Sequence, residues 1–177
     1  MVKGAHTRQS RSTGSERVRA SRDGDRFHYT WAATRLLQLL SPTSNLQQIS
    51  IEGLGIAPWD EEPDGSEVID LVEFYGPSGG VFTTLEVRQF KHSTLRPDEN
   101  LTLSEIGEIL NKFAELDESL RMRFPQAIVR FSIVTNKPIS TEACEAVREL
   151  ASGKPAEVGP SAARLRKSAD LSADAAA

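Results

Sequence analysis

The chain has 177 residues, a length that suits one folded domain with flanking segments. Hydrophobic residues make up 38% and charged residues 26%, a composition typical of globular proteins and not of disordered or membrane proteins. The net charge of −4 excludes a polycation, and the single cysteine, Cys144, excludes an internal disulfide framework. A lone cysteine fits a reducing compartment, so we expect a cytoplasmic protein without a membrane partner.

Residues 1–22 form a basic segment that shows no apolar periodicity. They hold six basic residues against a single acid, and we expect a flexible arm here. Such an arm can contact nucleic-acid phosphates without a fold of its own, and Arg17, Arg19 and Arg22 are the candidate contacts. A solvated segment without a partner is the alternative.

A helix is predicted at residues 25–40, where strong helix formers dominate the second half and Ser41-Pro42 ends the segment. Its apolar residues cover most of the helical circumference, so we expect it to be largely buried. Strands are predicted next at residues 47–54, 67–75 and 81–91. A short glycine-rich connection between the last two predicts that they form a hairpin.

The second half of the chain alternates helix and strand. Residues 103–122 carry apolar side chains at three-to-four spacing, and Thr102 with Glu105 fits the spacing of a capping box. A strand at 127–135 and a helix at 140–151 follow. The whole order predicts an α/β fold in which helices flank a central mixed β-sheet.

The composition changes again after residue 151. Residues 152–177 are rich in Gly, Pro, Ala and Ser and show no closing element. We expect a linker that leads to a downstream region of the natural protein. The expected organisation is therefore a basic arm at 1–22, a folded domain at 23–151 and a linker at 152–177.

Three polar residues on the predicted hairpin form a chemical constellation. Alternate residues of a strand share a face, so Gln89 and Lys91 point the same way at a strand end, and a modest register places Asp70 beside Gln89. A carboxylate and an amide oxygen can bind a hard cation such as Mg²⁺. Lys91 would orient or help deprotonate a water and stabilise transition-state charge, as phosphodiester hydrolysis requires. A polar strand edge without chemistry is the alternative, because these residue types are common.

Asp70 followed by Gln89-Phe90-Lys91-His92 resembles the Asp…Gln-x-Lys form of the PD-(D/E)xK motif, as found in Mrr-like restriction enzymes. More widely, residues 23–138 are similar to the double-stranded DNA nuclease domain of bacterial anti-phage proteins. That domain occurs in CBASS effectors and at the N-terminus of Avs-type STAND ATPases. The stretches that carry the likeness are Gly24-Asp25-Arg26-Phe27 with Tyr29 and Trp31, Ile51-Glu52-Gly53, Ile69–Gly76 and Arg88–Thr94.

The resemblance implies a restriction-endonuclease-like core and a metal-dependent endonuclease that cuts duplex DNA in anti-phage defence. It also implies Mg²⁺, with Mn²⁺ as the alternative cation, activity as a homo-oligomer, and a downstream ATPase or sensor domain. Asp70 and Gln89 would hold the cation, and Lys91 would act on the water. Because a neutral amide binds metal more weakly than a carboxylate, a further acid is expected nearby. Glu52 is the candidate, whereas Glu73 should face the opposite side of its strand.

His92 is the accessory candidate of the site. Strand alternation turns it away from Lys91, so it reaches the site only if the chain bends there. His28 lies among the aromatic residues of the first predicted helix, where we expect packing rather than metal binding.

A function of another class also fits the pattern. A catalytically inactive copy of the nuclease fold would serve as a module for DNA binding or oligomerisation. Convergence of Asp70, Gln89 and Lys91 would favour the enzyme, and divergence of the three would favour the module.

Overall fold

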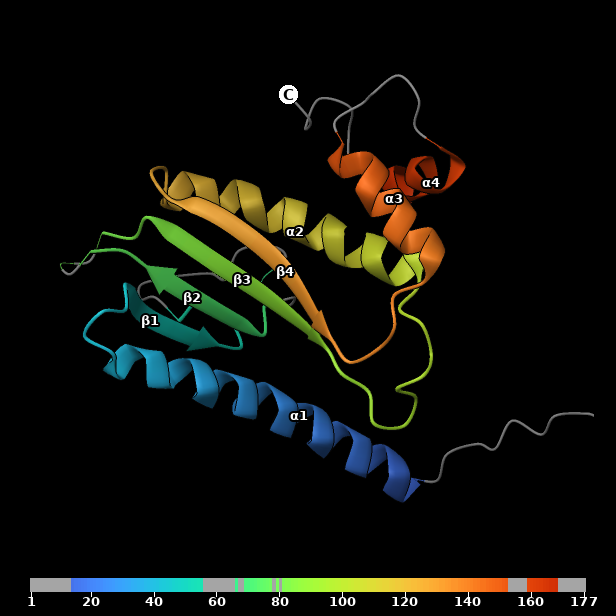
Figure 1. Cartoon of the computed structure of the whole chain (residues 1–177), viewed down its shortest axis with the longest axis horizontal. Helices are drawn as coiled ribbons and strands as arrows, with labels where there is room; N and C mark the ends of the chain where they lie inside the picture. The colour runs from blue at the N-terminus through green and yellow to red at the C-terminus, as the bar shows by residue number, and fades with distance from the viewer. Residues whose placement is uncertain are drawn as a thin grey trace, which may run out of the picture.

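The computed structural model describes residues 14–55, 66, 69–77, 79, 81–152 and 159–168, and within these ranges it describes the side chains of residues 22 to 167. Two long helices lie on opposite sides of a four-stranded sheet, and a pair of shorter helices follows the last strand (Figure 1). In chain order the elements are α1 (Gly14–Leu36), the 3-10 helix η1 (Leu37–Leu40), β1 (Leu46–Ile51), β2 (Leu71–Tyr75), β3 (Thr84–Lys91), α2 (Leu103–Arg123), β4 (Ile128–Thr135), α3 (Thr141–Ala151) and α4 (Pro160–Ser168).

The sheet has the order β1-β2-β3-β4 and is mixed. The first three strands pair antiparallel, with Ile51 opposite Leu71 and Leu71 opposite Arg88. β4 runs parallel to β3, and α2 supplies the crossover that a parallel connection needs. The predicted α/β fold with a mixed sheet and flanking helices is therefore confirmed, as is the hairpin of β2 and β3.

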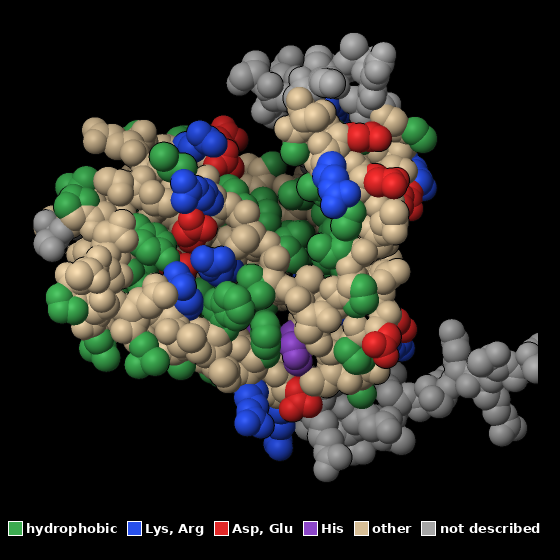
Figure 2. Space-filling model, in the orientation of Figure 1, with side chains coloured by type: hydrophobic (Ala, Val, Ile, Leu, Met, Phe, Trp, Pro, Cys, Tyr) green, Lys and Arg blue, Asp and Glu red, His purple; other side chains and the backbone are tan. Residues whose placement is uncertain are grey.

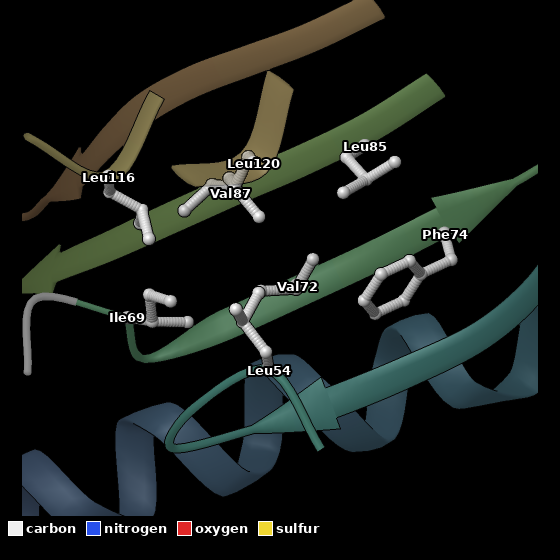
Figure 3. Close-up of a cluster of buried hydrophobic side chains, with 8 residues drawn as sticks. All are labelled: Leu54, Ile69, Val72, Phe74, Leu85, Val87, Leu116 and Leu120. Atoms are coloured by element: carbon white, nitrogen blue, oxygen red, sulfur yellow. The ribbon is translucent and has the colours of Figure 1, made fainter. Parts of the chain in front are cut away.

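The main core lies between the sheet and α2. It comprises Leu54, Ile69, Val72, Phe74, Leu85, Val87, Leu116 and Leu120 (Figure 3). Helix α2 contributes Leu116 and Leu120 to this core because its apolar residues recur at three-to-four spacing. The predicted capping box is also present, with the Thr102 hydroxyl accepting from the Glu105 backbone N–H and the Glu105 carboxylate accepting from the Thr102 backbone N–H.

Helix α1 differs from its prediction in both length and burial. It begins at Gly14, inside the segment expected to be a flexible arm, so residues 14–22 are helical. Among its described side chains only Ala32 is buried, and Leu37 and Leu40 of η1 are 66% and 78% exposed. The prediction of a largely buried helix was wrong, because α1 covers one face of the sheet and nothing in the described chain covers its outer side.

The candidate DNA contacts of the basic segment lie on this helix. Arg22 is exposed on α1. The backbone of Arg17 and Arg19 is helical, and their side chains lie outside the described residues, as do residues 1–13. Among the helices that the structure describes, none is both long enough and apolar enough to cross a bilayer.

Helix α4 occupies part of the segment that was expected to be a linker. Its Ala162 and Leu165 are buried beside Ala143 and Ala146 of α3 and beside Ile106 of α2. The local signals were a proline at the first helical position and apolar residues three apart. Residues 153–158 and 169–177 lie outside the described part of the chain, so the linker prediction is overturned only for the residues of α4.

Candidate active site

Backbone pairing brings the predicted site residues together at one end of the sheet. Glu52 directly follows β1, Asp70 directly precedes β2, and Gln89 lies near the end of β3. The Glu52 N–H donates to the Asp70 carbonyl, and the Asp70 N–H donates to the Arg88 carbonyl, each over 3.1 Å. The three residues therefore lie side by side across neighbouring strands, as the hairpin register predicted for Asp70 and Gln89.

The two oxygens of the Asp70 carboxylate have different surroundings. Oδ2 accepts a hydrogen bond from Gln89 Nε2 and another from the Phe90 backbone N–H, each over 2.5 Å. Oδ1 lies 3.6 Å from His28 Nδ1 on α1. The carboxylate is thus fixed through one oxygen, while the other faces the imidazole.

Burial raises the pKa of Asp70 above its ordinary value, and the nearby charge of Glu52 raises it further. The Phe90 N–H, the His28 ring and the Lys91 ammonium oppose this effect without cancelling it. A partly desolvated carboxylate with a second acid close by favours the approach of a positive charge. A divalent cation beside Asp70 would stabilise the charged carboxylate and so oppose the raised pKa.

The Gln89 side chain is buried and points its amide nitrogen at Asp70. The same Nε2 also donates to the Phe90 carbonyl over 3.2 Å. Because both Asp70 Oδ2 and this carbonyl accept from the nitrogen, they fix which end of the amide faces Asp70. These hydrogen bonds give Gln89 the role of holding Asp70. Binding of a metal through its carbonyl oxygen stays a prediction.

Lys91 and Glu52 complete the charged surroundings of Asp70. Lys91 is half-buried at the end of β3 and acts on Asp70 through its charge. Glu52 is exposed, and its Oε1 accepts from the Tyr29 hydroxyl over 3.4 Å. Its φ of 54° places it in the left-handed region, which costs a non-glycine residue on the order of 1 kcal/mol, and strained residues of this kind cluster at functional sites.

Aromatic side chains form the wall of the site next to α1. The Phe27 ring stacks on His92 with centroids 4.5 Å apart, and the His28 ring lies 4.9 Å from Phe90. His92 Nδ1 is buried without a hydrogen-bond partner among the described residues. His92 therefore packs against α1, and its accessory role stays a prediction. His28 packs as expected but also faces Asp70, which sequence reasoning missed because this contact depends on how α1 docks.

A buried charge network fixes α1 on the sheet. The Glu73 side chain is fully buried and accepts from Arg35 of α1, from Arg88 of β3 and from the Tyr75 hydroxyl. Burial alone would raise the pKa of Glu73, but the hydrogen bonds and charges of the two arginines together lower it. Arg35 lies two helical turns after His28, so the network sets the position from which His28 reaches Asp70.

The donors at this site fit a cation held by a few protein atoms. Within the described ranges, no three His, Cys, Asp or Glu side chains gather closely enough to hold a metal ion by themselves. Sites with one or two carboxylates, completed by water and substrate phosphate, are typical of Mg²⁺. Asp70 with Glu52 nearby fits that type and not a closed structural metal centre.

An apolar groove of about 370 Å³ lies elsewhere, between α2, β4 and α3. Hydrophobic side chains line this hollow in Figure 2. Phe113, Phe131 and Val147 are among its walls, and Cys144 borders it. It contains none of the charged residues that surround Asp70, so it plays no part in the candidate site.

No protein-family model matches the chain, and no curated protein is detectably similar to it. The function proposed below therefore rests on the fold, the site and the motif.

Proposed function

We propose that this chain is a metal-dependent endonuclease domain that hydrolyses phosphodiester bonds of double-stranded DNA. One observation carries the proposal: Gln89 Nε2 is hydrogen-bonded to Asp70 Oδ2 across neighbouring strands, with Lys91 two residues further along β3 and acting on Asp70 through its charge. In the alternative of a polar strand edge without chemistry, nothing requires an amide to fix a partly buried carboxylate within range of the Lys91 charge.

We assign the sheet and its helices to a restriction-endonuclease-like core. The support is the order of elements, in which a helix and three antiparallel strands precede a helix and a parallel strand. In this order Gln89 and Lys91 belong to the central strand β3, and Asp70 directly precedes the other central strand, β2. The motif and the topology thus favour the same assignment independently.

Each residue of the site has a distinct task in this proposal. Asp70 would hold the cation through Oδ1, with Glu52 as a second acid, and Gln89 keeps the Asp70 carboxylate in place. A divalent cation held there would lower the pKa of a bound water and offset negative charge that develops on the phosphate. Lys91 orients the attacking water and stabilises negative charge on the phosphate.

The family resemblance also supports a proposal for the biological role of the chain. It favours an effector of bacterial anti-phage defence that acts as a homo-oligomer under a downstream ATPase or sensor region. Arg22, exposed on α1, is the described candidate for contact with DNA phosphates. These assignments rest on the motif rather than on any contact in the structure.

Incubation of the purified chain with supercoiled plasmid tests the proposal. Nicked or linear DNA should form in Mg²⁺ or Mn²⁺ and should be absent in EDTA. A gel shift in EDTA separates binding from cleavage. Retardation of DNA without cleavage in either cation, also when the protein is clustered through a fused oligomerisation domain, would favour the inactive binding module.

A further inference from the structure

Helix α1 directs a ring nitrogen toward the carboxylate of Asp70. His28 Nδ1 lies 3.6 Å from Asp70 Oδ1, and both side chains are largely buried, at 20% and 16% exposure. Hydrogen bonds between nitrogen and oxygen usually span about 2.7–3.2 Å, so this pair is too far apart for one. Two atoms that each lie about 2.1 Å from one cation are separated by roughly 3–3.6 Å. The observed distance fits two ligands of a shared ion.

The contacts around the two side chains leave Asp70 Oδ1 and His28 Nδ1 as the atoms available to a shared ion. Asp70 Oδ2 is saturated by Gln89 Nε2 and the Phe90 N–H, which leaves Oδ1 as the oxygen that faces His28. The His28 ring is held by contacts to Phe27 and Phe90, so its Nδ1 keeps its direction. Gln89 turns its nitrogen and not its oxygen toward Asp70, so the motif leaves a ligand position for another residue to fill.

We infer that His28 Nδ1 is a protein ligand of the cation beside Asp70 Oδ1, and that it makes the site prefer Mn²⁺ over Mg²⁺. Mg²⁺ takes oxygen ligands almost exclusively, whereas imidazole nitrogen binds first-row transition metals well. The inference rests on the cation site of the proposed function, but it concerns metal binding and not cleavage. Gln89 on β3 is neutral and turns its nitrogen toward Asp70, so in this arrangement His28 on α1 supplies the second protein ligand in its place.

Mn²⁺ binding to the untagged chain without DNA provides the test. Electron paramagnetic resonance of free Mn²⁺ gives the affinity, and electron spin echo modulation of the bound ion detects a directly coordinated nitrogen. In His28→Asn the side-chain Oδ1 can occupy the position of the imidazole Nδ1, so the variant exchanges nitrogen for oxygen with little change in shape. His92→Asn is the matched control, because His92 belongs to the same aromatic wall but stacks on Phe27.

Wild type and His92→Asn should show the nitrogen coupling, and His28→Asn should lose it. The Mn²⁺ affinity of His28→Asn should fall about tenfold or more, the order of loss common when a supporting group of a metal site is removed, while Mg²⁺ affinity changes little. Circular dichroism verifies that the variants are folded. If His28→Asn is unfolded, a wild type that lacks nitrogen coupling would still overturn the inference.

Absence of Mn²⁺ binding, or coupling that persists in folded His28→Asn, overturns the inference. Its failure is distinct from failure of the nuclease. Nitrogen coupling that depends on His28 in a chain that cuts no DNA supports the ligand and refutes the enzyme. Cleavage by a chain without nitrogen coupling supports the enzyme and refutes the ligand.

Discussion

Gln89 Nε2 on β3 donates a 2.5 Å hydrogen bond to Asp70 Oδ2, which joins a strand residue to a residue 19 positions earlier that directly precedes β2. The Phe90 N–H donates to the same oxygen. The neutral residue of the motif therefore fixes the acid, and the other carboxylate oxygen is directed toward α1. Because Gln89 fixes Asp70 without adding a charge, we predict that a charged residue at position 89 makes the stability of the protein depend on a bound cation.

Gln89→Glu should make the stability of the protein depend on metal. The substitution removes an N–H donor and places a second carboxylate against Asp70, which should cost about 1–3 kcal/mol in EDTA. A cation between the two acids offsets this repulsion, so Mn²⁺ should raise Tm more in the variant than in wild type. Thermal denaturation with and without Mn²⁺ measures this difference. Gln48→Glu on β1 is the control, and equal metal-induced shifts in all three proteins would contradict the assignment.

Asp70→Asn should stabilise the fold while it removes the function. Burial raises the pKa of Asp70, which means that its charged form is unfavourable in the folded protein. Asparagine keeps an oxygen acceptor for Gln89 and Phe90 but carries no charge. We expect a gain of about 1 kcal/mol near pH 7 in EDTA, or about 2–4 °C in Tm for a domain of this size. A loss of stability would show that Asp70 is held by contacts that need its charge.

Glu73→Gln should destabilise the protein by about 3 kcal/mol, because it leaves Arg35 and Arg88 without their buried partner. The pKa of Glu73 is lowered on folding, so its stabilising effect is complete above the ordinary value of 4.5. That effect is lost as pH falls through the lowered pKa. Urea denaturation across this pH range should show the difference between variant and wild type shrinking toward acid. A difference independent of pH would contradict the role of the charge.

Leu165→Ala tests whether α4 belongs to the folded domain. Leu165 is fully buried in the cluster that joins α4 to α2 and α3, so its truncation should cost about 2–5 kcal/mol. Ala163→Ser on the exposed side of α4 is the control and should change stability little. Urea denaturation measures both variants. If Leu165→Ala unfolds like wild type, α4 contributes nothing to the stability of the domain.

The reach of sequence reasoning differs between local and tertiary features. The start of α2 was predicted correctly and its end to within one residue, because periodicity and a capping box mark the same segment. The pairing of Asp70 with Gln89 followed from strand alternation across one hairpin. The start of α1 was missed because residues 14–22 have no apolar periodicity.

The contact of His28 with Asp70 could not be predicted from any local pattern. It depends on the docking of α1, which the buried contacts of Glu73 with Arg35 and Arg88 determine. Helix α4 had a local signal in the spacing of Ala162 and Leu165, but its composition resembled that of a linker. Short helices of this kind become stable only through the tertiary surface that buries them.

Plasmid cleavage by Lys91→Ala tests the central claim most directly. Lys167→Ala, which changes an exposed lysine of α4, is the matched control for loss of one positive charge. With Mn²⁺ or Mg²⁺, wild type and Lys167→Ala should cut the plasmid, while Lys91→Ala should lose about a hundredfold or more in rate and still be folded. Cleavage by folded Lys91→Ala at the wild-type rate would contradict the proposal that Asp70, Gln89 and Lys91 form the active site.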